Sequence, residues 1–286
     1  MPARRLAILA LFLAPAVLGG CNNVFFQPDP IRYFVPSQFG LWHEEVTFTS
    51  ADGTQISGWF LPARPPAQGT IIHFHGNAAN ITNHIYGVRW LPPRGFSVFL
   101  FDYRGYGASE GSPSREGAIE DGAAAIRYVR SRPDVDPNRL IVYGQSLGGA
   151  LAVNALAEVG TDGVKALVLE GTFRSYREMV LLKMQNTWFL WPFQYPVAYL
   201  LFTDHLSPEE ALPALSAVPT LIIHGEADST VPFAAGKRLF ESVASPDRTF
   251  WAVPGAGHLE VFGHPGSSWR ARLIAYLRDR LDRKNP

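Results

Sequence analysis

The chain has 286 residues, with 25 basic and 25 acidic side chains. This length suits one large α/β domain or two small ones. The balanced charge, without a run of Lys or Arg, provides no phosphate-binding stripe, so composition argues against a nucleic-acid partner.

The N-terminal residues have the pattern of an export signal. Met1 to Arg5 form a basic region and Leu6 to Leu18 form an apolar run, as in the first two regions of a secretory signal peptide. The run is shorter than the roughly 20 residues that span a bilayer. It ends in Leu18-Gly19-Gly20-Cys21, which resembles the lipobox of bacterial lipoproteins.

The lipobox resemblance implies that residues 1–20 are removed and that Cys21 is lipidated as the mature N-terminus. Cys21 is the single cysteine, so the chain can form no internal disulfide. We therefore expect a lipid-anchored protein of the cell envelope. Asn22 is not the aspartate that often retains such proteins in the inner membrane, which favours the outer membrane, facing the periplasm, in a cell with two membranes. The alternative is an ordinary signal peptide followed by an unrelated cysteine.

Residues 21–40 contain prolines and little periodicity, which indicates a tether before a domain over residues 41–286. The domain begins with two strands, Glu45–Thr49 and Gln55–Leu61. They flank Ala51-Asp52-Gly53, a hairpin turn signal, so this pair is expected to be antiparallel.

Short apolar runs and amphipathic stretches then alternate along the chain. Such runs are typical of parallel strands covered on both faces, and the alternation predicts an α/β fold with a mostly parallel sheet and helices on both faces. The expected strands are Thr70–Phe74, Ser97–Phe101, Leu140–Tyr143, Ala166–Leu169 and Thr220–Ile223, and the clearest helices are Glu116–Arg130 and Phe233–Val243.

A serine stands between one of these strands and an Ala/Leu-rich helical segment, within Gly144-Gln145-Ser146-Leu147-Gly148. A strand that ends in Gly-X-Ser-X-Gly and turns into a helix is a nucleophile elbow, whose tight turn presents the hydroxyl. The segment fits neither the Walker nor the dinucleotide-binding spacing. Ser146 is therefore the candidate nucleophile, and a glycine-rich turn without chemistry is the alternative.

A serine nucleophile needs a base, and the base needs an acid that orients it. Asp228 follows the strand Thr220–Ile223, and His258 lies on a loop after another expected strand. The order Ser, Asp, His along the chain is that of the α/β-hydrolases. We therefore expect Ser146, Asp228 and His258 to form a catalytic triad.

After about residue 40 the chain resembles an α/β-hydrolase-fold serine hydrolase. His75-Gly76-Asn77 and the loop from Asp102 to Gly111 are similar to motifs of a subgroup that includes depalmitoylating hydrolases and their bacterial relatives. The resemblance implies an oxyanion hole formed by the backbone N–H groups of Leu147 and Asn77, and no cofactor. The subgroup commonly has glycine where this chain has Ala79.

Several other residues compete for these roles. Glu170 directly follows a strand, where some α/β-hydrolases have their acid, and His264 lies close to His258. His73 and His75 could suggest a metal pair, but without neighbouring ligands, core packing and hydrogen bonding are favoured, so no metal is expected. Asp102 and Arg104 are expected to hold the loop beside the site.

The segment of about residues 172–215 is rich in aromatic and Met side chains, more than a connecting helix requires. It is expected to form a helical cap over the serine, with an apolar slot for an acyl chain or simple packing as the two alternatives. These side chains are Met179, Met184, Trp188, Phe189, Trp191, Phe193, Tyr195, Tyr199 and Phe202.

Together these features predict a serine hydrolase that cleaves carboxylic esters or thioesters through an acyl-enzyme. Its expected partners are a small-molecule or acylated substrate and, through the N-terminal anchor, a lipid membrane. A peptidase or aminopeptidase of the same fold is one alternative. A non-catalytic binding protein of the envelope is the other.

Overall fold

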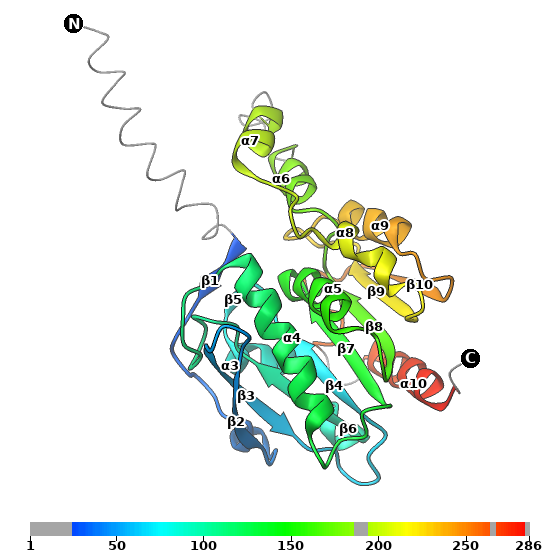
Figure 1. The fold of residues 1–286 in the computed structure, drawn as a ribbon. Coiled ribbons are helices and arrows are strands. Elements are labelled where there is room, and N and C mark those ends of the chain that lie inside the picture. Colours follow the sequence, from blue (N-terminus) through cyan, green and yellow to red (C-terminus); the bar gives the residue numbers. More distant parts are fainter. Residues whose placement is uncertain (1–24, 186–193, 264–266, 284–286) are drawn as a thin grey trace, which may run out of the picture.

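A twisted eight-stranded sheet organises the chain (Figure 1). The computed structural model describes residues 25–185, 194–263 and 267–283. The strand order is β10-β9-β8-β7-β4-β6-β3-β2, and neighbours are parallel except that β3 is antiparallel to both β2 and β6. The strands of this sheet are β2 (Glu44–Thr49), β3 (Gln55–Leu61), β4 (Gly69–Phe74), β6 (Phe96–Phe101), β7 (Leu140–Gln145), β8 (Val164–Glu170), β9 (Thr220–Gly225) and β10 (Arg248–Val253).

This architecture confirms the predicted fold class, and the predicted strands agree with the observed ones within two residues at either end. The helices α4 and α9 were also predicted, whereas α3 and α10 were not. The helices are α3 (Ile81–Val88), α4 (Arg115–Ser131), α5 (Leu147–Val159), α6 (Tyr176–Gln185), α7 (Gln194–Leu201), α8 (Pro208–Ala211), α9 (Phe233–Ser242) and α10 (Ser268–Asp282), with short 3-10 helices η1 (Pro36–Phe39), η2 (Pro92–Arg94) and η4 (Leu212–Leu215).

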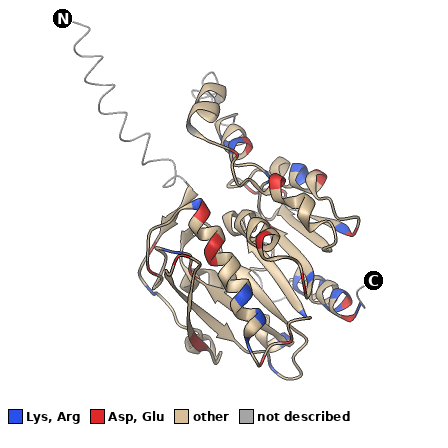
Figure 2. Ribbon diagram, viewed as in Figure 1, with Lys and Arg blue, Asp and Glu red and all other residues tan. Residues whose placement is uncertain are grey.

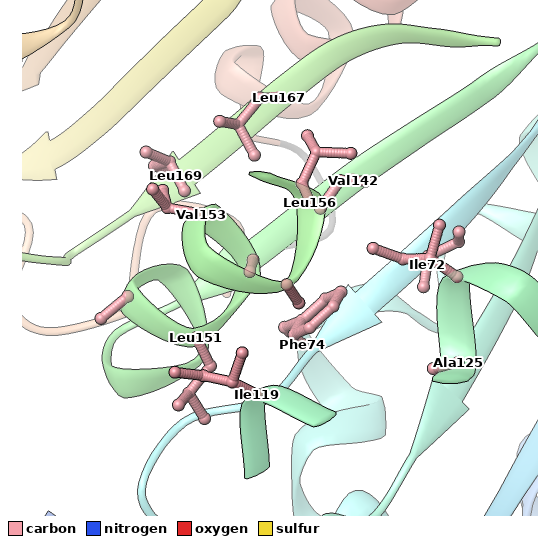
Figure 3. Close-up of a cluster of buried hydrophobic side chains, with 14 of the residues drawn as sticks. Ile72, Phe74, Ile119, Ala125, Val142, Leu151, Val153, Leu156, Leu167 and Leu169 are labelled. Atoms are coloured by element: carbon pink, nitrogen blue, oxygen red, sulfur yellow. The ribbon is translucent and has the colours of Figure 1, made fainter. Parts of the chain in front are cut away.

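The core lies in two layers, one on each face of the sheet. Side chains alternate along each strand, so that Ile72 and Phe74 of β4 pack with α4 and α5, while Ile71 packs with α3 and α10. Figure 3 shows the first layer, in which Phe74 meets residues of both α4 and α5. Acidic and basic side chains lie along the helices and loops around the sheet (Figure 2).

The segment 21–40, expected to be a tether, is part of the packed domain from its first described residues. A two-residue strand, β1 (Gln27–Pro28), pairs in parallel with β5 (Ala78–Ala79). The side chain of Asn80 donates hydrogen bonds to the carbonyl groups of Asp29 and Ile31, each at 2.7 Å. The segment is therefore fixed beside the loop that follows β4. Cys21 and the rest of the expected leader lie outside the described residues.

The insertion between β8 and β9 has two parts. Helices α6 and α7 pack on each other and project beyond the sheet, whereas α8 and η4 pack against α5 (Figure 1). The expected cap thus corresponds to α6 and α7. Four of its expected aromatic residues lie outside the described residues: Trp188, Phe189, Trp191 and Phe193. Within the described ranges, no helix is long and apolar enough to cross a membrane.

Two buried polar side chains hold the loop after β6, as expected for Asp102 and Arg104. Arg104 forms an ion pair with buried Asp121 at 2.8 Å. Asp102 Oδ1 accepts a hydrogen bond from the N–H of Ile81 at 2.8 Å, which ties the loop to the start of α3. Burial raises the pKa of Asp102 from its ordinary value of 3.8 to about 7, because a charged carboxylate loses its hydration there.

We expect Asp102→Asn to weaken the pH dependence of stability. A carboxyl whose pKa is raised by folding stabilises the native state below about pH 4, and this contribution is lost as the pH rises through about 7, by at most about 1.4 kcal/mol per pH unit. Free energies of unfolding in urea at pH 5 and pH 8 measure the effect. The wild type should lose more stability between these values than the variant; equal losses would show that Asp102 does not titrate in this range.

Candidate active site

Ser146 occupies a strained turn between β7 and α5. Its φ of 53° and ψ of −123° lie in a region that residues with a side chain rarely adopt. The flanking glycines permit this turn: a Cβ at position 148 would lie 2.2 Å from the carbonyl oxygen of His75, and one at position 144 would lie 2.5 Å from the Cα of Gly149. The turn places the serine hydroxyl at the start of α5, as the sequence motif predicts.

The structure brings Ser146, His258 and Asp228 together in one hydrogen-bonded chain. His258 Nε2 lies 3.1 Å from Ser146 Oγ, and His258 Nδ1 lies 2.7 Å from Asp228 Oδ2. The other oxygen, Asp228 Oδ1, accepts hydrogen bonds from the N–H groups of Thr230 and Val231, both at 2.8 Å. With Nδ1–H donated to the carboxylate, Nε2 is left as the acceptor that faces the serine hydroxyl.

The loops that carry Asp228 and His258 are joined backbone to backbone. The N–H of Glu226 donates to the carbonyl of Val253, and the N–H of Ala227 donates to that of Ala256, both at 3.0 Å. The parallel pairing of β9 and β10 puts the carboxyl ends of both strands at the same edge of the sheet. An acid and a base that are 30 residues apart are thereby held in contact.

Glu170, the competing acid, lies at the end of β8 without contacting His258. Its Oε2 accepts hydrogen bonds from Tyr143 Oη and from Gln145 Nε2, and the side chain is fully buried. Burial raises the pKa of Glu170. The next residue, Gly171, passes so close to the imidazole that a Cβ there would lie 3.3 Å from His258 Nδ1. Glu170 is thus part of a buried hydrogen-bonded group with Tyr143 and Gln145, and it is not part of the chain from Ser146 to Asp228.

The two N–H groups expected in the oxyanion hole lie on adjacent segments. Leu147 is the first residue of α5, where the N–H has no partner within the helix. Asn77 is fixed on both sides: its Oδ1 accepts the N–H of Gln27 at 2.8 Å, and its carbonyl accepts Tyr106 Oη–H at 2.6 Å. Among the described residues, neither N–H has a hydrogen-bond acceptor, so both can bind an incoming oxygen.

Ala79, where the similar subgroup commonly has glycine, adopts a left-handed conformation with φ of 66°. Such a backbone favours glycine, because a Cβ is crowded there. Pairing holds the residue in place: Ala79 belongs to β5, and its carbonyl accepts the N–H of Asp29 at 3.3 Å. These contacts hold Ala79 in its left-handed conformation although the residue is not glycine.

The remaining histidines near the site are buried and bonded to their surroundings. His73 Nε2 lies 2.9 Å from Gln145 Oε1, and His75 Nδ1 lies 2.7 Å from the carbonyl of Gly76. Burial lowers the pKa of both, that of His73 to about 3. No group of three or more metal-ligating side chains is found in the part of the chain that the structure describes. His264 lies outside the described residues.

A cavity of about 540 Å³ opens over Ser146, within the size range of small-molecule sites. The loop of Asn77, the loop of His258 and the cap all contribute to its wall. Met179 and Met184 of α6, and Phe202 after α7, supply apolar surface from the cap, whereas Tyr195 and Tyr199 are exposed to solvent. The cap residues thus divide between an inner face that lines the cavity and an outer face.

Several lining residues are not anticipated from the sequence, and Phe25, Gln27 and His84 are the most informative of them. Phe25 and Gln27 belong to the segment that was expected to be a tether. The one feature of the sequence that could have indicated a buried role there is an aromatic residue before a proline-rich segment. His84 of α3 stacks on His75 with ring centroids 5.0 Å apart, and its Nε2 donates to the carbonyl of Ala78 at 2.9 Å. Burial lowers the pKa of His84, so the neutral ring supports the loop of Asn77.

Comparisons with known proteins agree with this geometry. A family model described as the alpha/beta hydrolase fold matches residues 69–206. The chain is 35% identical to the protein YfhR of Escherichia coli (strain K12) over 96% of this chain and 92% of that protein. It is 35% identical to the alpha/beta hydrolase domain-containing protein WAV2 of Arabidopsis thaliana over 83% of this chain and 80% of that protein.

Among solved structures, the esterase Pf2001 of Pyrococcus furiosus superimposes with a TM-score of 0.72 at 20% identity, over 90% of this chain and 98% of that chain. At this identity the likeness concerns the fold. Taken with the family match and the full-length relatives, it leads to one conclusion: the chain belongs to the α/β-hydrolase fold family.

Proposed function

We propose that this protein is a serine hydrolase that cleaves carboxylic esters or thioesters through an acyl-enzyme. The observation that carries the proposal is the chain from Ser146 Oγ through His258 to Asp228 at the base of a largely apolar cavity. Hydrolysis is the reaction class associated with the fold, and the similar Pyrococcus protein is named an esterase. The resemblance of the His75-Gly76-Asn77 segment to the depalmitoylating subgroup supports the same reaction.

In the proposed mechanism, Ser146 Oγ attacks the acyl carbon while its proton passes to His258 Nε2. The carbonyl oxygen becomes an oxyanion held by the N–H groups of Leu147 and Asn77. When the tetrahedral intermediate collapses, the bond to the leaving alcohol or thiol breaks and His258 returns the proton to it. A water molecule then attacks the acyl-enzyme by the same route, which releases the acid and restores Ser146.

Asp228 is proposed to orient the imidazole and to stabilise its protonated form. Its Oδ2 binds His258 Nδ1–H, and two backbone N–H groups hold its Oδ1. The carboxylate therefore has a fixed direction before the reaction begins. This removes the need to reorganise when charge develops on the imidazole.

The lining of the cavity favours an ester or thioester over an aminopeptidase substrate. A protonated amino terminus needs a carboxylate to bind it, and no Asp or Glu lies among the described residues that line the cavity. The apolar side chains suit an acyl chain instead. A non-catalytic binding role would leave the aligned serine and histidine without a purpose.

We expect Ser146→Ala to abolish hydrolysis of 4-methylumbelliferyl butyrate, with a loss of several orders of magnitude in kcat. Thermal unfolding of both proteins checks that the variant is folded, and a fluorophosphonate probe should label the wild type alone. Wild-type turnover by the folded variant would exclude Ser146 as the nucleophile. An unlabelled, inactive wild type would favour the binding protein.

Asp228→Asn and Glu170→Gln distinguish the two candidate acids. Asp228→Asn should lower kcat by roughly 10⁴, because the imidazole is held in the wrong tautomer. Glu170→Gln should lower kcat less than about tenfold, since a neutral amide can replace a carboxyl that burial disposes to protonation. The same soluble ester measures both, and a reversed order of losses would transfer the role of the acid to Glu170.

We also propose that Cys21 carries the lipid anchor and that the protein faces the periplasm from the outer membrane in a two-membrane cell. The support is the lipobox-like sequence that ends at this cysteine. A diacylglyceryl group with a third acyl chain anchors stably, whereas one chain binds only marginally. Cys21→Ser should therefore abolish incorporation of labelled fatty acid and block processing at residue 20. Lipid labelling that survives the substitution would refute this attachment site.

A further inference from the structure

The first described residues of the chain form part of the cavity wall. The ring of Phe25 packs edge-on against Tyr176 at the start of α6, with centroids 5.0 Å apart, and against Phe202 after α7, at 5.8 Å. Phe25 and Phe202 both line the cavity over Ser146. The chain therefore enters the domain at the junction between the cavity and the cap.

This position limits how far the cavity can lie from the proposed anchor. Phe25 follows Cys21 by four positions, and an extended chain spans at most about 3.6 Å per residue, or about 14 Å here. The headgroup layer of a bilayer is roughly 5–8 Å thick on each side. A lipid on Cys21 thus holds the Phe25 side of the cavity at the membrane surface, whatever the conformation of the intervening residues.

The outer face of α7 presents large exposed side chains beside the guanidinium of Arg177, which lies 4.5 Å from the centroid of the Tyr199 ring. Tyr195 is 58% exposed, Tyr199 61% and Leu200 81%. The helix Gln194–Leu201 contains no charged residue, and Figure 2 shows it without acidic or basic positions. Tyrosines with an exposed leucine are typical of segments that lie at the membrane interface. Large exposed apolar side chains that gather on one helix indicate a binding surface.

The point where the described chain enters the domain and the helix α7 are on the same side of the molecule. In Figure 1, β1 and the pair α6–α7 lie toward the same end, and the contacts of Phe25 with Tyr176 and Phe202 join them directly. A chain held at Phe25 by a short anchor therefore brings α7 to the same bilayer. Phe25, which lines the cavity, is thus in contact with the helix pair that carries the outer face of α7.

We infer that the outer face of α7 docks on the bilayer that holds the anchor, and that the cavity receives its acyl chain from that bilayer. The substrate class is then a long-chain acyl ester dissolved in the membrane; this part rests on the proposed hydrolase activity, and the docking rests on the proposed lipid anchor at Cys21. An acyl chain that moves from lipid to the apolar wall formed by Met179, Met184 and Phe202 never crosses water, which avoids the cost of hydrating it.

The docking is tested without catalysis, in the full-length protein with Ser146→Ala reconstituted into phosphatidylcholine vesicles. Leu200→Cys is labelled with a nitrobenzoxadiazole fluorophore, and doxyl-labelled phosphatidylcholine is added as a quencher. Trp42→Cys is the matched control, because Trp42 is 68% exposed and comes two residues before β2. The strand β2 lies at the opposite end of the molecule from α7 (Figure 1). The protein without either new cysteine reports any labelling of Cys21.

Quenching at position 200 should exceed that at position 42 at least threefold. Equal quenching at both positions, or none at position 200, would overturn the docking. A third outcome is that the fluorophore at position 200 is shielded from water but not quenched by the labelled lipid, while the protein sediments as a dimer. In that case the face of α7 binds a second copy of the chain, and the bilayer is excluded as its partner.

The acyl route is tested with two esters that share one leaving group. Leu200→Glu should lower kcat/KM at least tenfold for 4-methylumbelliferyl palmitate dissolved in the vesicles. For the soluble butyrate the same variant should lower kcat/KM less than twofold. The control Trp42→Glu should leave kcat/KM unchanged for both esters. Equal losses on both esters, or no loss, would refute delivery from the bilayer. A wild type inactive on both esters would refute the proposed function, while the quenching experiment still decides the docking.

Discussion

The site depends on the close approach of three backbone segments at the elbow. The end of β7, the start of α5 and the end of β4 come so near that only glycine fits at positions 144 and 148. Ser146 has a positive φ of 53° in this turn, and a Cβ at Gly76, the residue before Asn77, would lie 3.5 Å from the Cβ of Ser146. Because β7 and β4 are neighbours in the sheet, the proposed nucleophile and the proposed oxyanion loop are placed by the same interaction.

The surroundings of the elbow contain many ionisable groups, and burial moves most of them toward the neutral form. The pKa of Glu170 is raised, and those of His73, His75 and His224 are lowered, in each case mainly by desolvation. Two backbone N–H groups bind Oδ1 of Asp228, and the imidazole of His258 binds its Oδ2. The carboxyl group that is hydrogen-bonded to His258 is therefore fixed in direction.

The sequence was sufficient for the features that depend on local pattern. Gly144, Ser146 and Gly148 specify a turn that few other residues can form, and short apolar strands with turn residues after them predicted where Asp228 and His258 would lie. Helix α10 also carried a usable signal, since Leu273, Leu277 and Leu281 recur every four residues and are buried.

Other features depend on contacts between distant segments, which no local pattern encodes. The pairing of β1 with β5 involves two residues on each strand, which is too few for an alternation of polar and apolar residues to be recognised. Phe25 lines the cavity because its ring packs against Tyr176 and Phe202. His84 supports the loop of Asn77 through stacking and a hydrogen bond to Ala78. The competing acid Glu170 could be separated from Asp228 only by geometry, because both follow strands of the same sheet.

The segment after Cys21 therefore has two roles that cannot be separated. It holds Asn77 through the N–H of Gln27, and it supports the left-handed Ala79 through the N–H of Asp29. A glycine at position 79 would adopt this conformation without help, whereas an alanine carries a strain of roughly 1–2 kcal/mol that the neighbouring contacts must offset. The alanine at position 79 thus makes the conformation of the proposed oxyanion loop depend on the N-terminal segment being docked. Since the same residues connect to the proposed lipid anchor, the proposed membrane attachment and the proposed oxyanion hole share one stretch of backbone.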